Sequence, residues 1–252
     1  MLRPRVIPVL LLEDQVLVKT IQFKKPNYIG DPINAVKIFN DLKADELVFL
    51  DINATNQNRL IDLDFVRQVG EEANMPFSVG GGIKTLEDIR SIIAAGAERV
   101  VIGSYAIENP DFIKEASEEF GASTISVCID FKNNFFRKTK AYSLRGKIES
   151  KYSPIEFAKI MEEKGTGEII IQSIKKDGMM SGYDIDFIFE VSKLLKIPVI
   201  ALGGASNYSN LKKCFDQGYV SGVAAGSLFV YQGIHKGVLI NYPENKLSIF
   251  SK

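Results

Sequence analysis

The sequence predicts a closed (β/α)8 barrel, the TIM-barrel architecture, built as a single α/β domain from 252 residues. Eight short apolar runs alternate with helical patterns, and about 250 residues is an ordinary length for such a barrel. The runs are continuously apolar, as expected of parallel strands that are covered on both faces. A doubly wound open sheet would also alternate, but it rarely contains eight such even units.

Each unit can be assigned from its own residues. The predicted strands are Val6–Leu11, Leu47–Leu50, Phe77–Val79, Val100–Ile102, Ile125–Ile129, Ile169–Ile171, Val199–Leu202 and Gly222–Ala225. The predicted helices are 31–43, 59–73, 85–95, 109–119, 153–164, 184–196 and 206–217. Asp31, Asn109 and Ser153 each precede a proline, which is a helix-start signal. A last, short helix is expected after Gln232.

An internal repeat of about 120 residues divides the chain into two half-barrels, about 1–122 and 123–252. Pro76–Gly82 aligns with Pro198–Gly204, and Val100–Ser104 aligns with Val223–Ser227. No linker rich in Pro, Gly or Ser separates the halves, so we expect one closed domain with two related sites at the carboxyl ends of its strands.

Composition excludes several classes of function. Lys plus Arg and Asp plus Glu both total 31, so a basic nucleic-acid surface is not expected. Two cysteines and one histidine indicate neither a disulfide framework nor a zinc site, and we expect no metal and no cofactor. The apolar opening, Val6–Leu12, is too short to span a membrane, and no signal peptide is recognised. The chain is therefore expected to be cytoplasmic, without membrane or nucleic-acid partners.

Glycines follow four of the predicted strands in two matching pairs. Without side chains they let backbone N–H groups approach an anion closely, and a following helix N-terminus adds positive potential. The repeat thus predicts two phosphate cradles on opposite sides of the barrel mouth, for a ligand with two phosphates or for two phosphorylated ligands. The alternative is that glycine only shapes tight turns. The cradle residues are Gly81, Gly82, Gly103 and Ser104 in one half and Gly203, Gly204, Gly226 and Ser227 in the other.

Carboxylates also follow strands. Asp130 ends the fifth strand, Asp51 ends the second, and Asp177 with Gly178 lies just beyond the sixth. A carboxylate in a barrel mouth can act as a general acid or base, or it can hold a loop by hydrogen bonds. The repeat predicts a partner for Asp130 at position 11, but that position is Leu11, so paired acid–base catalysis is not expected.

Four charged residues precede strands, at the opposite end of the barrel. Arg5, Glu46, Arg99 and Glu168 could close a ring of charges, or they could be ordinary solvated strand starts.

At the mouth, two long basic loops, about 13–30 and 131–150, could cover an anionic substrate, or simply be solvated.

Five motifs carry a resemblance that extends over essentially the whole chain. They are Arg5–Pro8, Asp45–Ile52, Val79–Ile83, Ile129–Asp130 and Asp177–Asp184. Together they resemble the HisF family, the cyclase subunit of imidazole glycerol phosphate synthase. The resemblance implies a barrel that takes ammonia from a HisH glutaminase docked at its bottom. At the top, ammonia would react with a phosphoribulosyl nucleotide to give imidazole glycerol phosphate and an aminoimidazole carboxamide ribotide.

The resemblance also assigns roles to individual residues. Asp130 matches one of two catalytic aspartates, and Leu11 replaces the other. Lys19 matches a loop lysine that is linked to turnover, and the glycine pairs match the phosphate cradles. The four strand-start charges match a gate at the ammonia entrance. Three residues depart from the family's usual polar side chains at the top, namely Gly103, Gly226 and Gln172.

The strand-start charges at the bottom of the barrel match the family, whereas several residues at the mouth differ from it. This combination resembles a divergent HisF-like group found with genes for bacterial surface sugars. The matching segments are Leu10–Leu12, Leu17–Thr20, Gly30–Ala35 and Ala225–Val230. That resemblance implies a HisH-like glutaminase and a separate ATP-dependent sugar amidotransferase as partners, and a role in lipopolysaccharide O-antigen biosynthesis. The alternatives are an authentic cyclase of histidine biosynthesis, and a non-catalytic scaffold that docks a glutaminase. Because Leu11 stands in a catalytic position, enzyme activity is left open.

Overall fold

The computed structural model describes residues 4–233, 235–243, 245 and 249–250, and it contains the expected closed barrel. Eight parallel strands form the wall, and hydrogen bonds between β7 and β10 close it. The strands are β1 (Arg5–Glu13), β4 (Leu47–Asp51), β5 (Phe77–Gly80), β6 (Arg99–Ile102), β7 (Ile125–Asn133), β10 (Glu168–Ser173), β11 (Val199–Leu202) and β12 (Gly222–Ala225). All eight expected strands are therefore confirmed.

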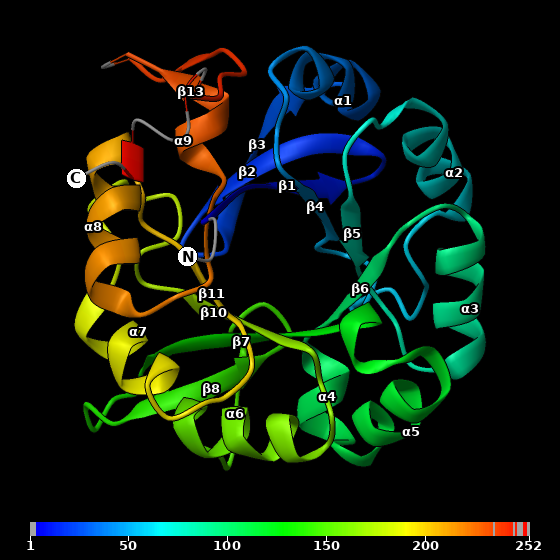
Figure 1. Cartoon of the computed structure of the whole chain (residues 1–252), viewed down its shortest axis with the longest axis vertical. Coiled ribbons are helices and arrows are strands. Elements are labelled where there is room, and N and C mark those ends of the chain that lie inside the picture. Colours follow the sequence, from blue (N-terminus) through cyan, green and yellow to red (C-terminus); the bar gives the residue numbers. More distant parts are fainter. Residues whose placement is uncertain (1–3, 234, 244, 246–248, 251–252) are drawn as a thin grey trace.

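Helices surround the barrel as an outer ring (Figure 1). They are α1 (Pro32–Asp41), α2 (Leu63–Glu72), α3 (Leu86–Ala94), α4 (Ser104–Glu108), α5 (Asp111–Phe120), α6 (Pro154–Glu163), α7 (Ile185–Ser192), α8 (Tyr208–Gly218) and α9 (Ser227–Val230), with a 3-10 turn, η1 (Ala122–Thr124). Asp31 and Ser153 cap α1 and α6 as expected, each accepting a backbone N–H three residues on. Asn109 does not cap a helix, because α5 begins at Asp111.

The two halves repeat a short helix after the fourth and eighth barrel strands. Helix α4 begins at Ser104 after Gly103, and α9 begins at Ser227 after Gly226. Around Gln232 the chain forms an antiparallel hairpin, in which β13 (Tyr231–Gln232) pairs with β14 (Gly237–Val238). Residues 249–250 are helical, and the flanking residues 246–248 and 251–252 lie outside the described part of the chain, so the extent of the expected last helix stays a prediction.

Both long loops are hairpins rather than irregular segments. Strands β2 (Val16–Ile21) and β3 (Lys24–Gly30) fold back on the end of β1. Strand β8 (Thr139–Ser143) pairs with the extended end of β7, and β9 (Ile148–Glu149) pairs with β8. Apolar periodicity did not reveal these strands, because most of their residues outside Leu17–Thr20 and Ala141–Tyr142 are at least partly exposed.

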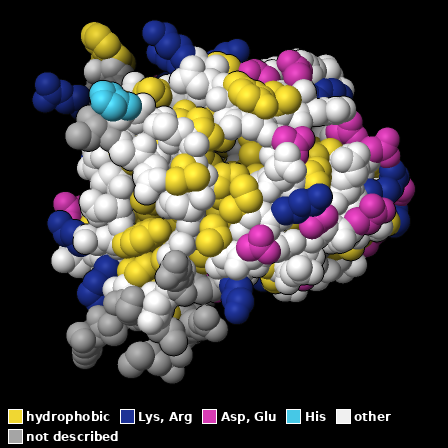
Figure 2. Space-filling view, turned by 90° about the horizontal axis from the view of Figure 1, so that it is seen from above, with side chains coloured by type: hydrophobic (Ala, Val, Ile, Leu, Met, Phe, Trp, Pro, Cys, Tyr) yellow, Lys and Arg dark blue, Asp and Glu magenta, His cyan; other side chains and the backbone are white. Residues whose placement is uncertain are grey.

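Apolar packing occurs in two places. The larger core lies between the barrel and the helices, and a smaller cluster fills the bore. The bore is lined largely by branched aliphatic side chains, among them Ile7, Val48, Val101, Ile170 and Ile200. On the outside, acidic and basic side chains are interspersed over the α1–α2 side of the face in Figure 2, without a large region of one sign. This distribution agrees with a formal net charge of zero.

Candidate functional site at the barrel mouth

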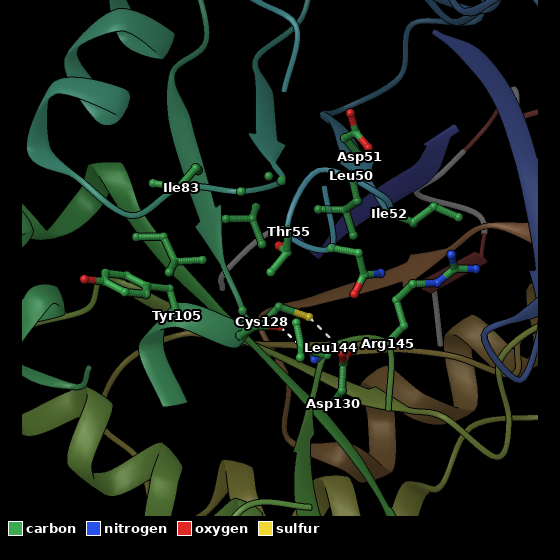
Figure 3. A pocket seen from close by; sticks show the side chains of 18 of the residues that line it. Leu50, Asp51, Ile52, Thr55, Ile83, Tyr105, Cys128, Asp130, Leu144 and Arg145 are labelled. Carbon is green, nitrogen blue, oxygen red and sulfur yellow. Dashed lines mark hydrogen bonds between the residues drawn. The ribbon is translucent and has the colours of Figure 1, made fainter. Parts of the chain in front are cut away.

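Asp130 lies in the mouth of the barrel, where β7 leaves the wall. The Cys128 thiol sits two residues earlier on the same face of the strand, as the two-residue period of a strand requires. Its Sγ lies 3.6 Å from Oδ1 of Asp130 and 3.7 Å from Oε1 of Gln172, so its single proton can be donated to either oxygen (Figure 3). Gln172 is the direct cross-strand neighbour of Asp130. The result is a small polar cluster at the top of an otherwise apolar bore.

Burial raises the pKa of the Asp130 carboxyl from 3.8 to about 7, because few polar groups replace the lost water. The Cys128 hydrogen bond lowers this pKa, whereas the negative charge of Asp177 raises it further. Burial likewise raises the pKa of the Cys128 thiol well above its ordinary value, so Cys128 stays protonated. A carboxyl group that titrates near neutral pH can both accept and donate a proton, as general acid–base chemistry needs.

Asp130→Asn should stabilise the protein at high pH. Since the folded-state pKa is raised above the unfolded value, the ionised carboxylate costs stability. That cost is absent below pH 3.8, grows as pH rises, and is complete above about pH 7. We expect the variant to gain at least about 1 kcal/mol in unfolding free energy over wild type at about pH 8, and little at about pH 4. Urea unfolding at both pH values measures this difference.

The matched control is Asp41→Asn, since Asp41 is exposed at the end of α1. This variant should shift unfolding equally at both pH values. A pH-independent effect of Asp130→Asn would show that the carboxyl group at position 130 is well solvated.

Leu11 occupies the mouth as an apolar residue. Its side chain is buried, pairs with Val18 of the β2–β3 hairpin and Leu50 of β4, and lines the same cavity as Asp130. Among the described residues that line this cavity, the carboxylates are Asp51 and Asp130. Asp51 has its own partners, described below. Among the described residues of this cavity, no second carboxylate is therefore free to exchange protons with Asp130.

The N-terminal glycine cradle opens into a cavity of about 140 Å³. Gly81, Gly82, Gly103 and Ser104 all line it, as the sequence predicts for one phosphate cradle. Gly82 is also required by packing, because a Cβ there would lie 1.8 Å from the carbonyl oxygen of Arg59. Gly103 is different: a Cβ would meet nothing closer than 3.8 Å. Packing therefore does not require glycine at position 103, and the missing side chain leaves space in the cavity.

The β8–β9 turn covers this cavity. The backbone N–H of Leu144 donates to Ser104 Oγ at 2.9 Å. Arg145 reaches across the mouth, donating from Nη1 to Asn53 Oδ1 at 2.9 Å and from Nη2 to the Phe23 carbonyl at 3.3 Å. In Figure 3, Ile83 and Tyr105 lie at one end of the cavity and Arg145 at the other. Three loops thus close over the cavity, and Arg145, which forms no ion pair with a described carboxylate, brings a positive charge to it.

Asp51 is engaged within its own loop. Oδ1 accepts the N–H groups of Asn53 and Ala54, both at 3.0 Å, and Oδ2 pairs with Arg59 Nη1 at 2.6 Å. These are the bonds expected of a carboxylate that holds a loop. Its assignment to ligand binding stays a prediction.

Asp177 and Lys19 form a buried ion pair at the second cradle. Lys19 Nζ lies 2.7 Å from Oδ1 of Asp177, and Oδ2 accepts from Thr20 Oγ1 at 2.8 Å and from the Phe23 N–H at 3.2 Å. Asp177 therefore connects the β2–β3 hairpin to the β10–α7 loop. Of the two roles expected for this carboxylate, these contacts match the holding of a loop by hydrogen bonds. Gly178 lies against this hairpin, where a Cβ would come within 2.2 Å of the Thr20 carbonyl.

The second cradle is smaller than the first. Lys19, Gly203, Gly204, Gly226 and Ser227 line a cavity of about 20 Å³. A Cβ on Gly226 would lie 2.9 Å from Lys19 Cε, so the lysine side chain occupies space next to the cradle. Within the described residues, the buried hydroxyl of Ser227 has no hydrogen-bond partner, as is also true of Ser117 on α5 and Ser192 on α7; of these three hydroxyls, that of Ser227 lines the second cradle. Phosphate binding at either cradle stays a prediction.

At the bottom of the barrel, the four strand-start charges meet. Glu46 Oε2 accepts from Arg5 Nη1 at 3.0 Å, and Glu46 Oε1 accepts from Arg99 Nη1 at 3.2 Å. Arg5 also pairs with Glu168. Glu46 and Glu168 are only 3% and 7% exposed, so they are not solvated strand starts. Within the described ranges the pairs form a chain, Glu168–Arg5–Glu46–Arg99, rather than a closed ring.

Two residues at the ends of the bore belong to no sequence motif. Cys128 could have been found from the strand period, since it shares a face with Asp130. Ser78, whose hydroxyl donates to Glu46 Oε1 at 3.3 Å, could have been found in the same way, from its inward position on β5. Across the described residues, there is neither a group of metal-ligating side chains nor a helix long and apolar enough to cross a membrane.

The fold and the site define a class of protein: a two-fold repeated (β/α)8 barrel with glycine cradles and an acidic residue at its mouth and a buried charge cluster at its base. The sequence matches the family described as "Histidine biosynthesis protein" over residues 5–236. Taken with the relatives below, this match shows that the chain belongs to the HisF family of histidine biosynthesis proteins.

Relatives along the full length support the same family. A Pseudomonas aeruginosa protein named "Putative imidazole glycerol phosphate synthase subunit hisF2" is 43% identical over 99% of this chain and 100% of its own. A Leptospira interrogans protein named "Putative imidazole glycerol phosphate synthase subunit HisF" is 43% identical over the same shares. A Streptococcus mutans protein named "Imidazole glycerol phosphate synthase subunit HisF" is 37% identical over 92% of each chain.

Proposed function

We propose that this chain is the barrel subunit of a glutamine-dependent amidotransferase complex. It takes ammonia from a HisH-like glutaminase at its bottom and passes it on for amidation of a surface-polysaccharide sugar. The observation that carries the proposal is the contrast between the two ends of the barrel. All four charges at the bottom are present and paired, with both glutamates buried, whereas Leu11 occupies the position at the top that the repeat matches to Asp130.

Ammonia would travel through the bore between the two ends, where packed aliphatic side chains would have to move to let it pass. The aliphatic lining of the bore favours a neutral molecule over an ion, because an unpaired ammonium ion would lose its hydration there. Arg5, Glu46, Arg99 and Glu168 would form the gate at the entrance. Asp130, with a pKa of about 7, would meet ammonia as it leaves the bore.

The similarity to relatives supports a HisF-type barrel subunit, which both candidate functions share. The Pseudomonas aeruginosa and Leptospira interrogans relatives, named putative HisF subunits, are 43% identical to the chain. The Streptococcus mutans relative, named HisF without qualification, is 37% identical. The phosphate cradles and Lys19 would hold a small phosphorylated ligand, and a separate ATP-dependent amidotransferase would receive the ammonia.

The second candidate is an authentic cyclase of histidine biosynthesis. The unpartnered Ser227 hydroxyl and the near-neutral pKa of Asp130 favour it, since they fit a phosphate subsite and one acid–base group. It requires acid–base catalysis without a carboxylate at position 11.

A genetic test separates the two functions. The gene is deleted in its own strain, and growth without histidine and the sugar composition of the surface polysaccharide are measured. We expect growth without histidine to continue and the amidino substituent of the polysaccharide to disappear. Complementation with the wild-type gene should restore the substituent. Histidine auxotrophy with an unchanged polysaccharide would establish the cyclase instead.

A further inference from the structure

Two phenylalanines are fully presented to solvent at the tip of the β7–β8 hairpin. The side chains of Phe135 and Phe136 are 94% and 77% exposed, although large aromatic residues ordinarily bury most of their surface. Among the described aromatic residues, their rings pair with each other and with no third ring, edge to face and with centroids 5.5 Å apart. The hairpin projects beyond the ring of helices beside α7 (Figure 1). An exposed aromatic pair of this kind marks an interaction surface.

Hydrogen bonds hold the backbone of the turn that carries the phenylalanines. Oδ1 of Asn134 accepts the N–H groups of Phe136 at 3.0 Å and Lys138 at 3.1 Å. The Asn134 N–H donates to the Lys138 carbonyl at 2.8 Å, and its amide Nδ2 donates to Glu149 at 3.0 Å. Since the turn is fixed before any partner arrives, binding through it loses little conformational entropy.

Charge indicates the chemistry of the partner. Lys132, Arg137, Lys138 and Lys140 lie on the hairpin, with Glu149 as the carboxylate opposite them on β9. No described carboxylate forms an ion pair with any of these cations. Phe135 and Phe136, with Lys138 and Lys140, also border a hollow that contains the Glu149 carboxylate. A hollow with this mixture of donors and acceptors fits a shaped protein surface better than a uniformly anionic lipid surface. The complementary surface is acidic and carries an apolar pocket.

The position of the hairpin indicates which partner this is. Phe135 lies two residues beyond the strand that carries Asp130: β7 ends at Asn133, and its extended chain from Asp130 to Asn133 spans about 10 Å. A protein held at this tip therefore lies beside the barrel mouth, at the opposite end from the charge cluster.

We propose that the Phe135–Phe136 tip docks the enzyme that consumes the ammonia, through an apolar pocket with an acidic rim on that enzyme. This inference rests on the proposed function. Docking at the rim of the mouth keeps ammonia out of bulk water, where it would be protonated and lost.

The test is photo-crosslinking from the tip in cells of the source strain. A benzophenone amino acid replaces Phe135 in the full-length chain, co-expressed with its glutaminase, and crosslinked proteins are identified by mass spectrometry. We expect an ATP-dependent amidotransferase as the product. The same probe at Tyr219, which is 73% exposed at the end of α8, is the matched control and should not yield this product.

A charge-reversed hairpin makes the test specific. With Arg137→Glu and Lys138→Glu present, the crosslink should fall at least fivefold while thermal unfolding stays unchanged, because both residues are at the solvated tip. A crosslink to lipid, to a second copy of the chain, to the glutaminase or to any other protein would overturn the proposal, as would no product above the Tyr219 control. Loss of the polysaccharide substituent on gene deletion is measured independently. It would uphold the proposed function even where docking fails.

Discussion

Leu11→Asp is expected to increase ammonia-dependent turnover of the phosphoribulosyl nucleotide at least about tenfold. General acid–base groups typically contribute about 10²- to 10⁴-fold, and position 11 lines the same cavity as Asp130. The wild-type chain should turn over at least about 10²-fold more slowly than the Streptococcus mutans relative, measured as a positive control. High ammonium replaces the glutaminase, so the assay reports only on the barrel mouth.

The control for this substitution is Leu11→Asn. It introduces a similar polar side chain among Val18 and Leu50 but cannot accept a proton. It should therefore share any loss of stability without the gain in turnover. Strong wild-type activity would contradict the proposed sugar-amidation role. Absence of activity in both wild type and Leu11→Asp would show that the mouth no longer holds the phosphorylated substrate.

Glu46→Ala should lower the free energy of unfolding by about 3 kcal/mol, the loss expected when one partner is removed from a buried ion pair. Glu46 accepts hydrogen bonds from Arg5, Arg99 and Ser78 and is only 3% exposed. Without it, two guanidinium groups and a hydroxyl remain at the bottom of the bore with fewer partners. Chemical denaturation near neutral pH measures the change.

Glu98→Ala is the matched control, because Glu98 is exposed and directly precedes Arg99. Its effect should stay within about 0.5 kcal/mol, as for most surface substitutions. Glu46→Gln should fall between the two, since it keeps the shape and some hydrogen bonds. Equal losses for Glu46→Ala and Glu98→Ala would mean that the four charges are solvated and contribute little. That result would also weaken the assignment of a gate.

The architecture could be predicted from the chain because its signals are local. Continuous apolar runs identify strands that are buried on both faces, and the 120-residue repeat places Gly103–Ser104 and Gly226–Ser227 at equivalent strand ends. The position of Asp130 at the mouth follows from its place directly after the fifth apolar run. The missing second carboxylate at Leu11 was visible for the same reason.

Only the tertiary structure shows the roles of residues whose partners lie on other loops. No sequence spacing shows that Lys19 pairs with Asp177, since these residues are 158 positions apart. The same holds for Arg145, which meets Asn53 and Phe23 only because the β8–β9 turn folds across the mouth. The hairpins themselves were missed because their partly exposed residues lack a strong apolar pattern.

The sequence by itself determined the barrel, its two-fold repeat and the chemical types at each strand end. Apolar runs and the order of residue types along the chain can be read from the sequence, and the repeat shows which strand ends are equivalent. Only the tertiary structure decided which carboxylates are engaged, that Glu46 and Glu168 are buried, and that Phe135 and Phe136 stand free at a rigid tip. Those properties depend on contacts between distant segments, whose geometry is set by how the loops close over the finished barrel.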